Sequence, residues 1–96
     1  SLGLENAREF SFYGLLYPFR ETMFSDSDEK QVAFTKKIIQ IIKEKRVIDW
    51  VEREDIQREM RREIKKLLKS NECPEDKVEP LTREIVSLAR IQLKEV

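Results

Sequence analysis

The chain has 96 residues, a formal net charge of zero and a charged fraction of 40%, a composition that fits one helical domain with solvated outer faces. Histidine is absent and cysteine occurs once, at Cys73, which excludes an internal disulfide, a cysteine metal site and the commonest general base. No apolar run reaches the roughly 18 residues of a membrane span, and the amino terminus lacks the basic-then-apolar order of a signal peptide. We therefore expect one cytoplasmic domain over residues 1–96, without a membrane partner.

Charge is unevenly distributed along the chain. Residues 1–29 carry two basic and six acidic side chains, a net −4, and residues 30–71 carry thirteen and seven, a net +6. Residues 72–96 carry four and six, a net −2. This layout fits either segments that pack on one another or a local basic surface for a polyanion. Because Glu and Asp are interspersed through the basic segment, solvated helix faces are the favoured interpretation.

Residues 4–24 contain most of the aromatic side chains, spaced three or four positions apart. This spacing predicts a helix that is apolar around much of its circumference and must be largely covered. Pro18 lacks an amide proton and should kink the helix or start a new turn. We expect the aromatic cluster to be core, with an exposed docking surface as the alternative. The cluster comprises Phe10, Phe12, Tyr13, Tyr17, Phe19 and Phe24.

A second helix is predicted over residues 28–45. Ser and Asp residues at 25–29 can cap its free amides, and acids in its first turn suit the helix dipole. Its broad apolar face consists of Val32, Phe34, Thr35, Ile38, Ile39, Ile41 and Ile42.

Residues 47–51 follow without a glycine turn, and we interpret them as an extended connector. Asp49 is a candidate cap for the next helix. Trp50, the only tryptophan, is expected to fill the space between the two long helices, with ligand stacking as the alternative.

A third helix, over residues 53–70, is amphipathic. Its apolar residues recur at helical spacing, and Ser70, Asn71 and Pro74 end the pattern. The predicted structural core includes Tyr13, Trp50, Ile56, Met60, Ile64 and Leu67. The other face carries six cations that are the candidate contacts to a partner or to DNA: Arg58, Arg61, Arg62, Lys65, Lys66 and Lys69. A solvated face that pairs with Glu59 and Glu63 is the favoured alternative.

Residues 71–80 are predicted to be a loop, and Pro80 suits the first turn of a last helix over residues 80–95. This helix would bury Leu81, Ile85, Leu88, Ala89 and Leu93. The predicted fold is all-α, a single domain of about four helices packed around one core.

The sequence offers no catalytic set and no metal-ligand set, and it predicts no cofactor for this domain. Glu52, Glu54 and Asp55 cluster as magnesium ligands can, but acids are expected at a helix start in any case. The string Pro74-Glu75-Asp76-Lys77 is superficially nuclease-like, yet it lacks a second acidic residue on a separate strand and we interpret it as a turn. A nucleophilic Cys73 would need an activating base that the sequence does not show.

Several short motifs, in order, resemble the C-terminal helical domain of type I restriction enzyme R subunits. They are Asn6-Ala7-Arg8 with Phe12-Tyr13, Ile48-Asp49-Trp50, Ile64-Lys65-Lys66-Leu67-Leu68 and Pro74-Glu75-Asp76-Lys77. The resemblance covers nearly the whole chain and is clearest from 47 to 77. Two departures concern the subfamily: Gly14 stands where an acidic residue often follows the Phe-Tyr pair, and Cys73 stands where an aromatic often precedes the proline.

The resemblance implies a non-catalytic assembly domain, a fragment of a larger R subunit. Such a subunit is a site-specific, ATP-dependent endonuclease with a nuclease domain and two motor domains that translocate DNA, and its use of ATP and magnesium lies outside this domain. The implied role is docking the motor on the methyltransferase core made of modification and specificity subunits. Two alternatives stay open: a helical module that contacts DNA through residues 53–69, and an independent small helical regulator.

Overall fold

The computed structural model describes residues 6–95, which form helices and short 3₁₀ turns and contain no strand in that range. The all-α fold that the sequence predicts is confirmed, with four long helices and one five-residue helix. The helices are α1 (Ala7–Leu16), α2 (Arg20–Phe24), α3 (Asp28–Lys45), α4 (Glu54–Ser70) and α5 (Glu75–Gln92). The 3₁₀ turns are Tyr17–Phe19 and Trp50–Glu52.

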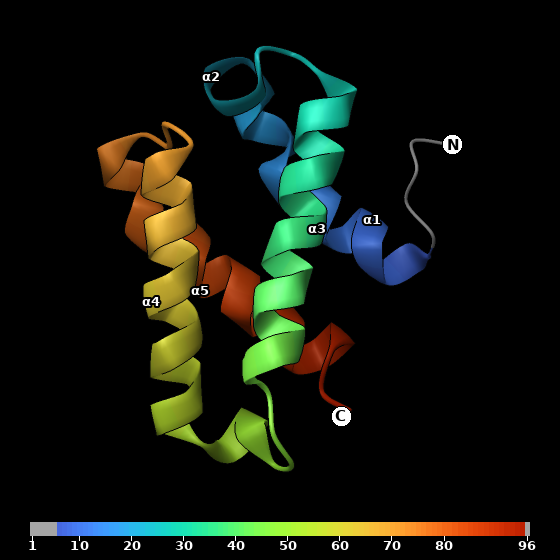
Figure 1. The fold of residues 1–96 in the computed structure, drawn as a ribbon, viewed down its shortest axis with the longest axis vertical. Helices are drawn as coiled ribbons and strands as arrows, with labels where there is room; N and C mark the ends of the chain where they lie inside the picture. Colours follow the sequence, from blue (N-terminus) through green and yellow to red (C-terminus); the bar gives the residue numbers. More distant parts are fainter. Residues whose placement is uncertain (1–5, 96) are drawn as a thin grey trace.

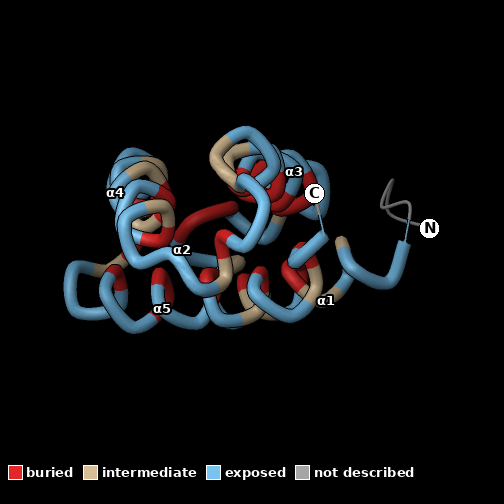
Figure 2. The backbone as a smooth tube through the Cα atoms, turned by 90° about the horizontal axis from the view of Figure 1, so that it is seen from below, coloured by how far each residue is buried: buried red, intermediate tan, exposed pale blue. Residues whose placement is uncertain are grey.

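The helices lie in two layers. One layer contains α3 and α4 side by side, and α5 crosses behind both of them (Figure 1). Seen from below, α1 and α5 form the second layer, and buried backbone lies where the layers meet (Figure 2). Residue contacts join α4 to α5, α1 to α3, α3 to α4 and α1 to α5, so each long helix packs against two others.

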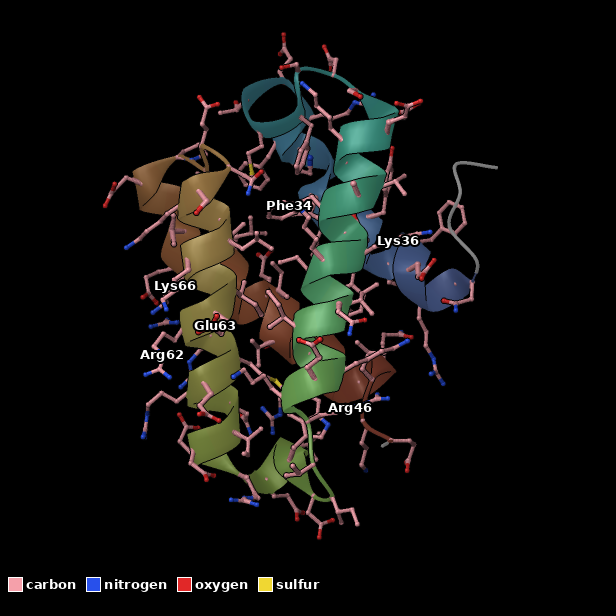
Figure 3. All side chains as sticks on the ribbon, viewed as in Figure 1. Phe34, Lys36, Arg46, Arg62, Glu63 and Lys66 are labelled. Carbon is pink, nitrogen blue, oxygen red and sulfur yellow. The ribbon has the colours of Figure 1, made fainter. Side chains whose placement is uncertain are left out.

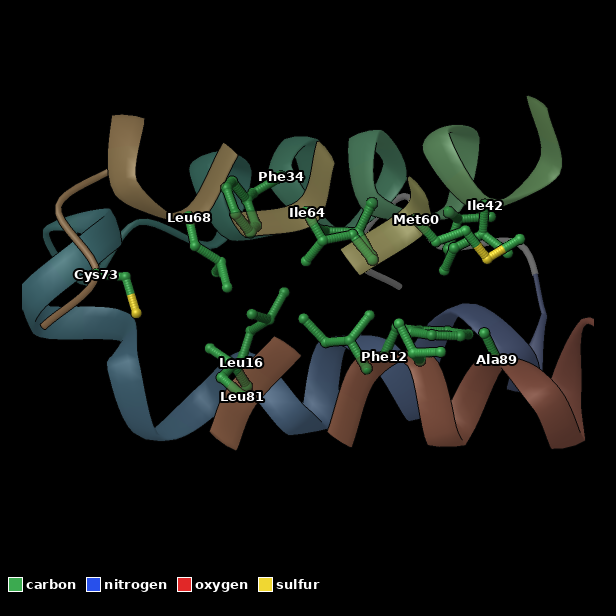
Figure 4. Packing of buried hydrophobic residues seen from close by; sticks show 14 of the residues in the cluster. Phe12, Leu16, Phe34, Ile42, Met60, Ile64, Leu68, Cys73, Leu81 and Ala89 are labelled. Atoms are coloured by element: carbon green, nitrogen blue, oxygen red, sulfur yellow. The ribbon is translucent and has the colours of Figure 1, made fainter. Parts of the chain in front are cut away.

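A single large apolar cluster fills the space between the layers. Phe34 and Ile42 of α3, with Met60, Ile64 and Leu68 of α4, face Leu16, Phe12, Leu81 and Ala89 of the other layer (Figure 4). Trp50 is among the largest fully buried side chains. Tight burial of this kind fixes how each helix is rotated about its axis, because a small rotation would expose apolar area that stabilises the fold by about 25 cal/mol per Å².

Local signals explain where the helices begin and end. The side chain of Asn6 accepts a hydrogen bond from the amide of Glu9 (3.0 Å), and Ser27 accepts one from Lys30 (3.2 Å), as N-caps do. Helix α4 ends in a Schellman motif, in which the amide of Cys73 donates to the carbonyl of Leu68 (3.1 Å). The left-handed position of that motif holds Glu72, with φ 64°, where glycine is the usual residue.

The aromatic segment confirms one prediction and corrects another. Pro18 starts a new turn, one of the two expected outcomes: it lies in the 3₁₀ turn that separates α1 from the short α2. Phe12, Tyr13 and Phe24 are buried, but Phe10 and Tyr17 are 46% and 56% exposed. The prediction that the whole cluster is core is therefore wrong at these two positions, because α1 packs on α3 and α5 with one side only. Residues 4 and 5 of the predicted helix lie outside the described residues.

The sequence predicts an extended connector after α3, and this prediction is wrong. Trp50 begins a 3₁₀ turn, and Asp49 adopts a left-handed conformation with φ 62°. Asp49 does not cap α4, whose N-cap is Arg53 without a side-chain hydrogen bond. The side-chain Nε2 of Gln57 instead donates to the backbone carbonyls of Trp50 (3.1 Å) and Val51 (3.0 Å), which holds the turn against α4.

The last helix begins five residues before Pro80, so the predicted loop over 71–80 and the place of Pro80 in the first turn are wrong. Pro74 is the N-cap residue, and Glu75 and Asp76 supply the acids of the first turn. Pro80 lies inside α5, where its missing amide leaves the carbonyl of Asp76 without its intrahelical donor. Asp76 is exposed, so water can bind that carbonyl. The early start lets Val78 reach the core.

Candidate partner-binding surface

Helix α4 is held in place from its apolar side. Met60, Ile64 and Leu68 are fully buried against the other helices. The indole Nε1 of Trp50 donates to the carbonyl of Leu93 (3.3 Å), the same oxygen that accepts a hydrogen bond from Arg46 (3.0 Å). The 3₁₀ turn that leads into α4 is thereby tied to the end of α5, and the outward face of α4 has a fixed orientation.

Two residues predicted as core lie at its margin. Tyr13, Trp50, Met60 and Ile64 are buried, whereas Ile56 and Leu67 are partly buried and pack against the edge of the cluster. Ile56 and Leu67 are three turns apart on α4, and Glu63, also partly buried, lies on that same flank.

The six cations predicted as contacts lie together on the opposite flank of α4. We call them the basic strip: Arg58, Arg61, Arg62, Lys65, Lys66 and Lys69 line one shallow hollow along the helix. Arg61 and Lys65 are partly buried, and the other four are exposed. Arg62 and Lys66 point away from the bundle, on the edge of the molecule farthest from α3 (Figure 3).

Three cations of the basic strip have carboxylate partners. Arg61 pairs with Glu54 (2.6 Å), Lys65 pairs with Glu79 of α5, and Lys66 pairs with Glu63 (3.6 Å). These pairs leave Arg58, Arg62 and Lys69, which have no carboxylate within 4.0 Å anywhere in residues 6–95. The expected pairing with Glu63 occurs, but Glu59 makes no ion pair in that range, and Glu54 and Glu79 take part instead.

The positive charge of the basic strip acts on its carboxylates. A hydrogen bond from Arg61, with the charges of Arg61 and Arg58, lowers the pKa of Glu54. A hydrogen bond from Lys65 likewise lowers the pKa of Glu79. Both carboxylates are therefore ionised at neutral pH, and each neutralises part of the charge around it.

Sequence reasoning missed two cations of α5. Arg83 lies 3.9 Å from Glu79, the carboxylate that also binds Lys65. The charge of Arg90 also contributes, as the smallest of several causes, to the lowered pKa of Glu54. Glu79, Arg83 and Arg90 recur at intervals of four and seven on one flank of α5, a periodicity that is visible in the sequence. Which helix this flank faces depends on the tertiary fold and could not be read from periodicity.

The groups considered for chemistry have other partners. Asp55, weighed as a magnesium ligand with Glu52 and Glu54, pairs with Arg53 (2.8 Å). No group of three or more His, Cys, Asp or Glu side chains that could hold a metal ion occurs within residues 6–95. Burial raises the pKa of the Cys73 thiol, which keeps it protonated and unreactive at neutral pH. Among these same residues, no helix is long and apolar enough to cross a membrane.

The fold and the surface place the chain in the class of small all-helical domains with a charged outer face. The comparison with known families then identifies the chain. Residues 1–95 match the family described as "Type I restriction enzyme HindI endonuclease subunit-like, C-terminal", and the chain belongs to it. The resemblance drawn from the sequence is confirmed. No curated protein and no solved structure matches the chain significantly.

Proposed function

We propose that this domain is a non-catalytic assembly module that docks the ATP-dependent translocase and nuclease of a cytoplasmic type I restriction enzyme on its methyltransferase core. Membership of a C-terminal endonuclease-subunit family gives the context. In this proposal the ATP and magnesium used by the parent enzyme bind elsewhere in that enzyme, and the partners are the modification and specificity subunits.

One observation carries the proposal: the basic strip combines fixed position with unsatisfied charge. The buried side of α4 holds the strip in place, and Arg58, Arg62 and Lys69 have no carboxylate partner in the described part of the chain. A row of cations on a helix of fixed orientation needs no backbone rearrangement on binding, and its charge speeds encounter with an acidic surface. We infer that the strip faces an acidic patch of the methyltransferase core.

The test compares association of the chain with the methyltransferase core before and after changing Arg58, Arg62 and Lys69 together to Gln. Gln keeps helix propensity close to that of Arg and Lys, so the fold should persist. The control matched in charge changes three exposed lysines of α3 together to Gln: Lys36, on the other side of the bundle (Figure 3), with Lys37 and Lys43. We expect slower association for the triple variant, most clearly at low salt, and no change for the control. Equal rates for the triple variant and the parent would show that the strip does not dock.

The second candidate is direct contact with duplex DNA, favoured by the same three unpaired cations. Arg and Lys at this density can bind phosphates, but no aromatic side chain is interleaved with them for base stacking. The triple variant separates the candidates. Loss of affinity for a nonspecific duplex, with a salt dependence flatter by about one unit per contact removed, would support DNA contact.

A further inference from the structure

Helix α5 crosses behind α4 (Figure 1), and the pair between Lys65 and Glu79 marks a point where the two helices approach each other. Four residues earlier on α4 is Arg61, and four residues later on α5 is Arg83, so each of these two cations lies one helical turn from that pair. The carboxylate of Glu79 lies within reach of the charge of Arg61 as well, which contributes to its lowered pKa. The basic strip therefore continues across this point onto α5.

Glu79 lies at the centre of this extended surface. It pairs with Lys65 of α4 and lies 3.9 Å from Arg83 of its own helix, so one carboxylate forms ion pairs with cations of both helices. Its side chain is 56% exposed, and that of Arg83 is 76% exposed. Both ion pairs are thus open to water and to competing anions, and each is individually weak. Glu79 occupies the place that a carboxylate of a partner would take.

We propose that the docking surface spans both helices, with Arg83 as an additional contact residue, and that Glu79 limits its affinity by occupying Lys65 and Arg83. This inference rests on the proposed docking function. An acidic group of the partner exchanges with Glu79 at these two cations, and the net gain on binding is the difference between the two interactions. Removing the charge of Glu79 removes the competitor and adds one unit of positive charge to the surface.

The test measures association of the chain with the methyltransferase core by stopped-flow at several salt concentrations. Glu79→Gln keeps the shape of the side chain without its charge, and we expect association to become about two- to fivefold faster at low salt. The gain should disappear toward 1 M salt, where the screening length is about 3 Å. Arg83→Gln should slow association.

A matched control uses the same helix and the same change of charge. Glu84→Gln alters an exposed carboxylate on the opposite flank of α5, next to Leu15 and Pro18 in another hollow. We expect it to leave the association rate unchanged. Thermal melts of each variant report whether the fold is intact, and because these groups are exposed, melting temperatures should stay close to that of the parent.

The outcomes separate this inference from the proposed function. If the triple variant of Arg58, Arg62 and Lys69 slows association but Glu79→Gln does not quicken it beyond Glu84→Gln, the docking function stands and the role of Glu79 is wrong. If the triple variant associates like the parent, docking by the strip fails and the inference fails with it. If Glu79→Gln strengthens binding to a nonspecific DNA duplex but not to the methyltransferase core, the surface is a DNA contact and the docking inference is overturned.

Discussion

Replacing Trp50 with Ala tests how α4 and its charged face are held in place. The indole is fully buried in the cluster between the helix layers. Truncating a large buried aromatic to Ala costs about 3–5 kcal/mol, while a domain of this size has a free energy of unfolding of about 5–15 kcal/mol. The substitution should therefore remove a large part of the total stability.

The hydrogen bond of Trp50 adds less than its packing. The carbonyl of Leu93 loses the indole donor in the variant but keeps the guanidinium of Arg46 at 3.0 Å, so the oxygen does not become unpaired. Trp50→Phe, which keeps an aromatic ring but has no donor, should cost only about 1–2 kcal/mol. The pair of variants separates loss of volume from loss of the hydrogen bond.

The assay is thermal unfolding followed by far-ultraviolet circular dichroism, which reports helix and does not depend on the tryptophan. A change of 1 kcal/mol shifts the melting temperature of a domain this size by about 4–8 °C. Trp50→Ala should therefore melt at least about 12 °C below the parent or be unfolded at room temperature. If Trp50→Ala melted within a few degrees of the parent, the indole would not be a core residue, and the anchoring of α4 described above would be wrong.

Three further predictions concern other parts of the molecule. The first changes four strip residues together to Gln: Arg58, Arg61, Lys65 and Lys69. The melting temperature should stay within about 5 °C of the parent, association with the methyltransferase core should become slower, and DNA binding should hardly change. Intact assembly with a flatter DNA salt dependence would contradict this prediction. Gln57→Ala should cost about 1–2 kcal/mol in urea unfolding because two backbone carbonyls lose its amide, and Gln57→Glu, which cannot donate, should cost at least as much. A hydrogen bond from Arg20 lowers the pKa of Asp28 in the folded state, so this carboxylate contributes stability at neutral pH that is lost as the pH falls from about 4 through the lowered pKa. The difference in melting temperature between the parent and Asp28→Asn should be largest near pH 7 and shrink below pH 4, and a constant difference would refute the role of this charge.

Helix α3 shows what local sequence determines well. The bounds predicted for it, 28–45, match those observed, because Ser27 caps its start and apolar residues recur on one face to its end. The amphipathic pattern of α4 likewise gives its bounds within one residue. In both helices the local preference for helix and the burial of one face favour the same structure. The periodicity of apolar residues is therefore sufficient to predict where each helix begins and ends.

The elements that sequence reasoning missed depend on contacts between distant residues. Arg46 and the carbonyl of Leu93 are 47 positions apart, and the buried amide of Gln31 donates to the carbonyl of Tyr13 (2.9 Å), 18 positions away. Pro80 suggested a helix start because local preference places proline in a first turn, but burial of Val78 starts α5 earlier. Packing outweighs the local preference at this position.

The basic strip was predictable as a face of one helix, and its neighbourhood was not. The spacing of its cations places them together, as observed. The identity of the carboxylates that neutralise it depends on how α5 lies against α4. Glu79 of α5 pairs with Lys65, whereas Glu59, which lines a hollow with Arg58 and Arg62, makes no ion pair within residues 6–95. The position of Arg83 of α5 near the strip depends on the same packing of α5 against α4.

Sedimentation velocity of the fluorescently labelled chain with the reconstituted methyltransferase core tests the central claim most directly. The docking function predicts that at low salt and micromolar concentration the chain sediments with the core, and that added salt releases it as charge attraction is screened. A chain that sediments alone at low salt in the presence of excess core, while melting as a folded helical domain, would contradict the claim that this domain docks the restriction subunit on the methyltransferase.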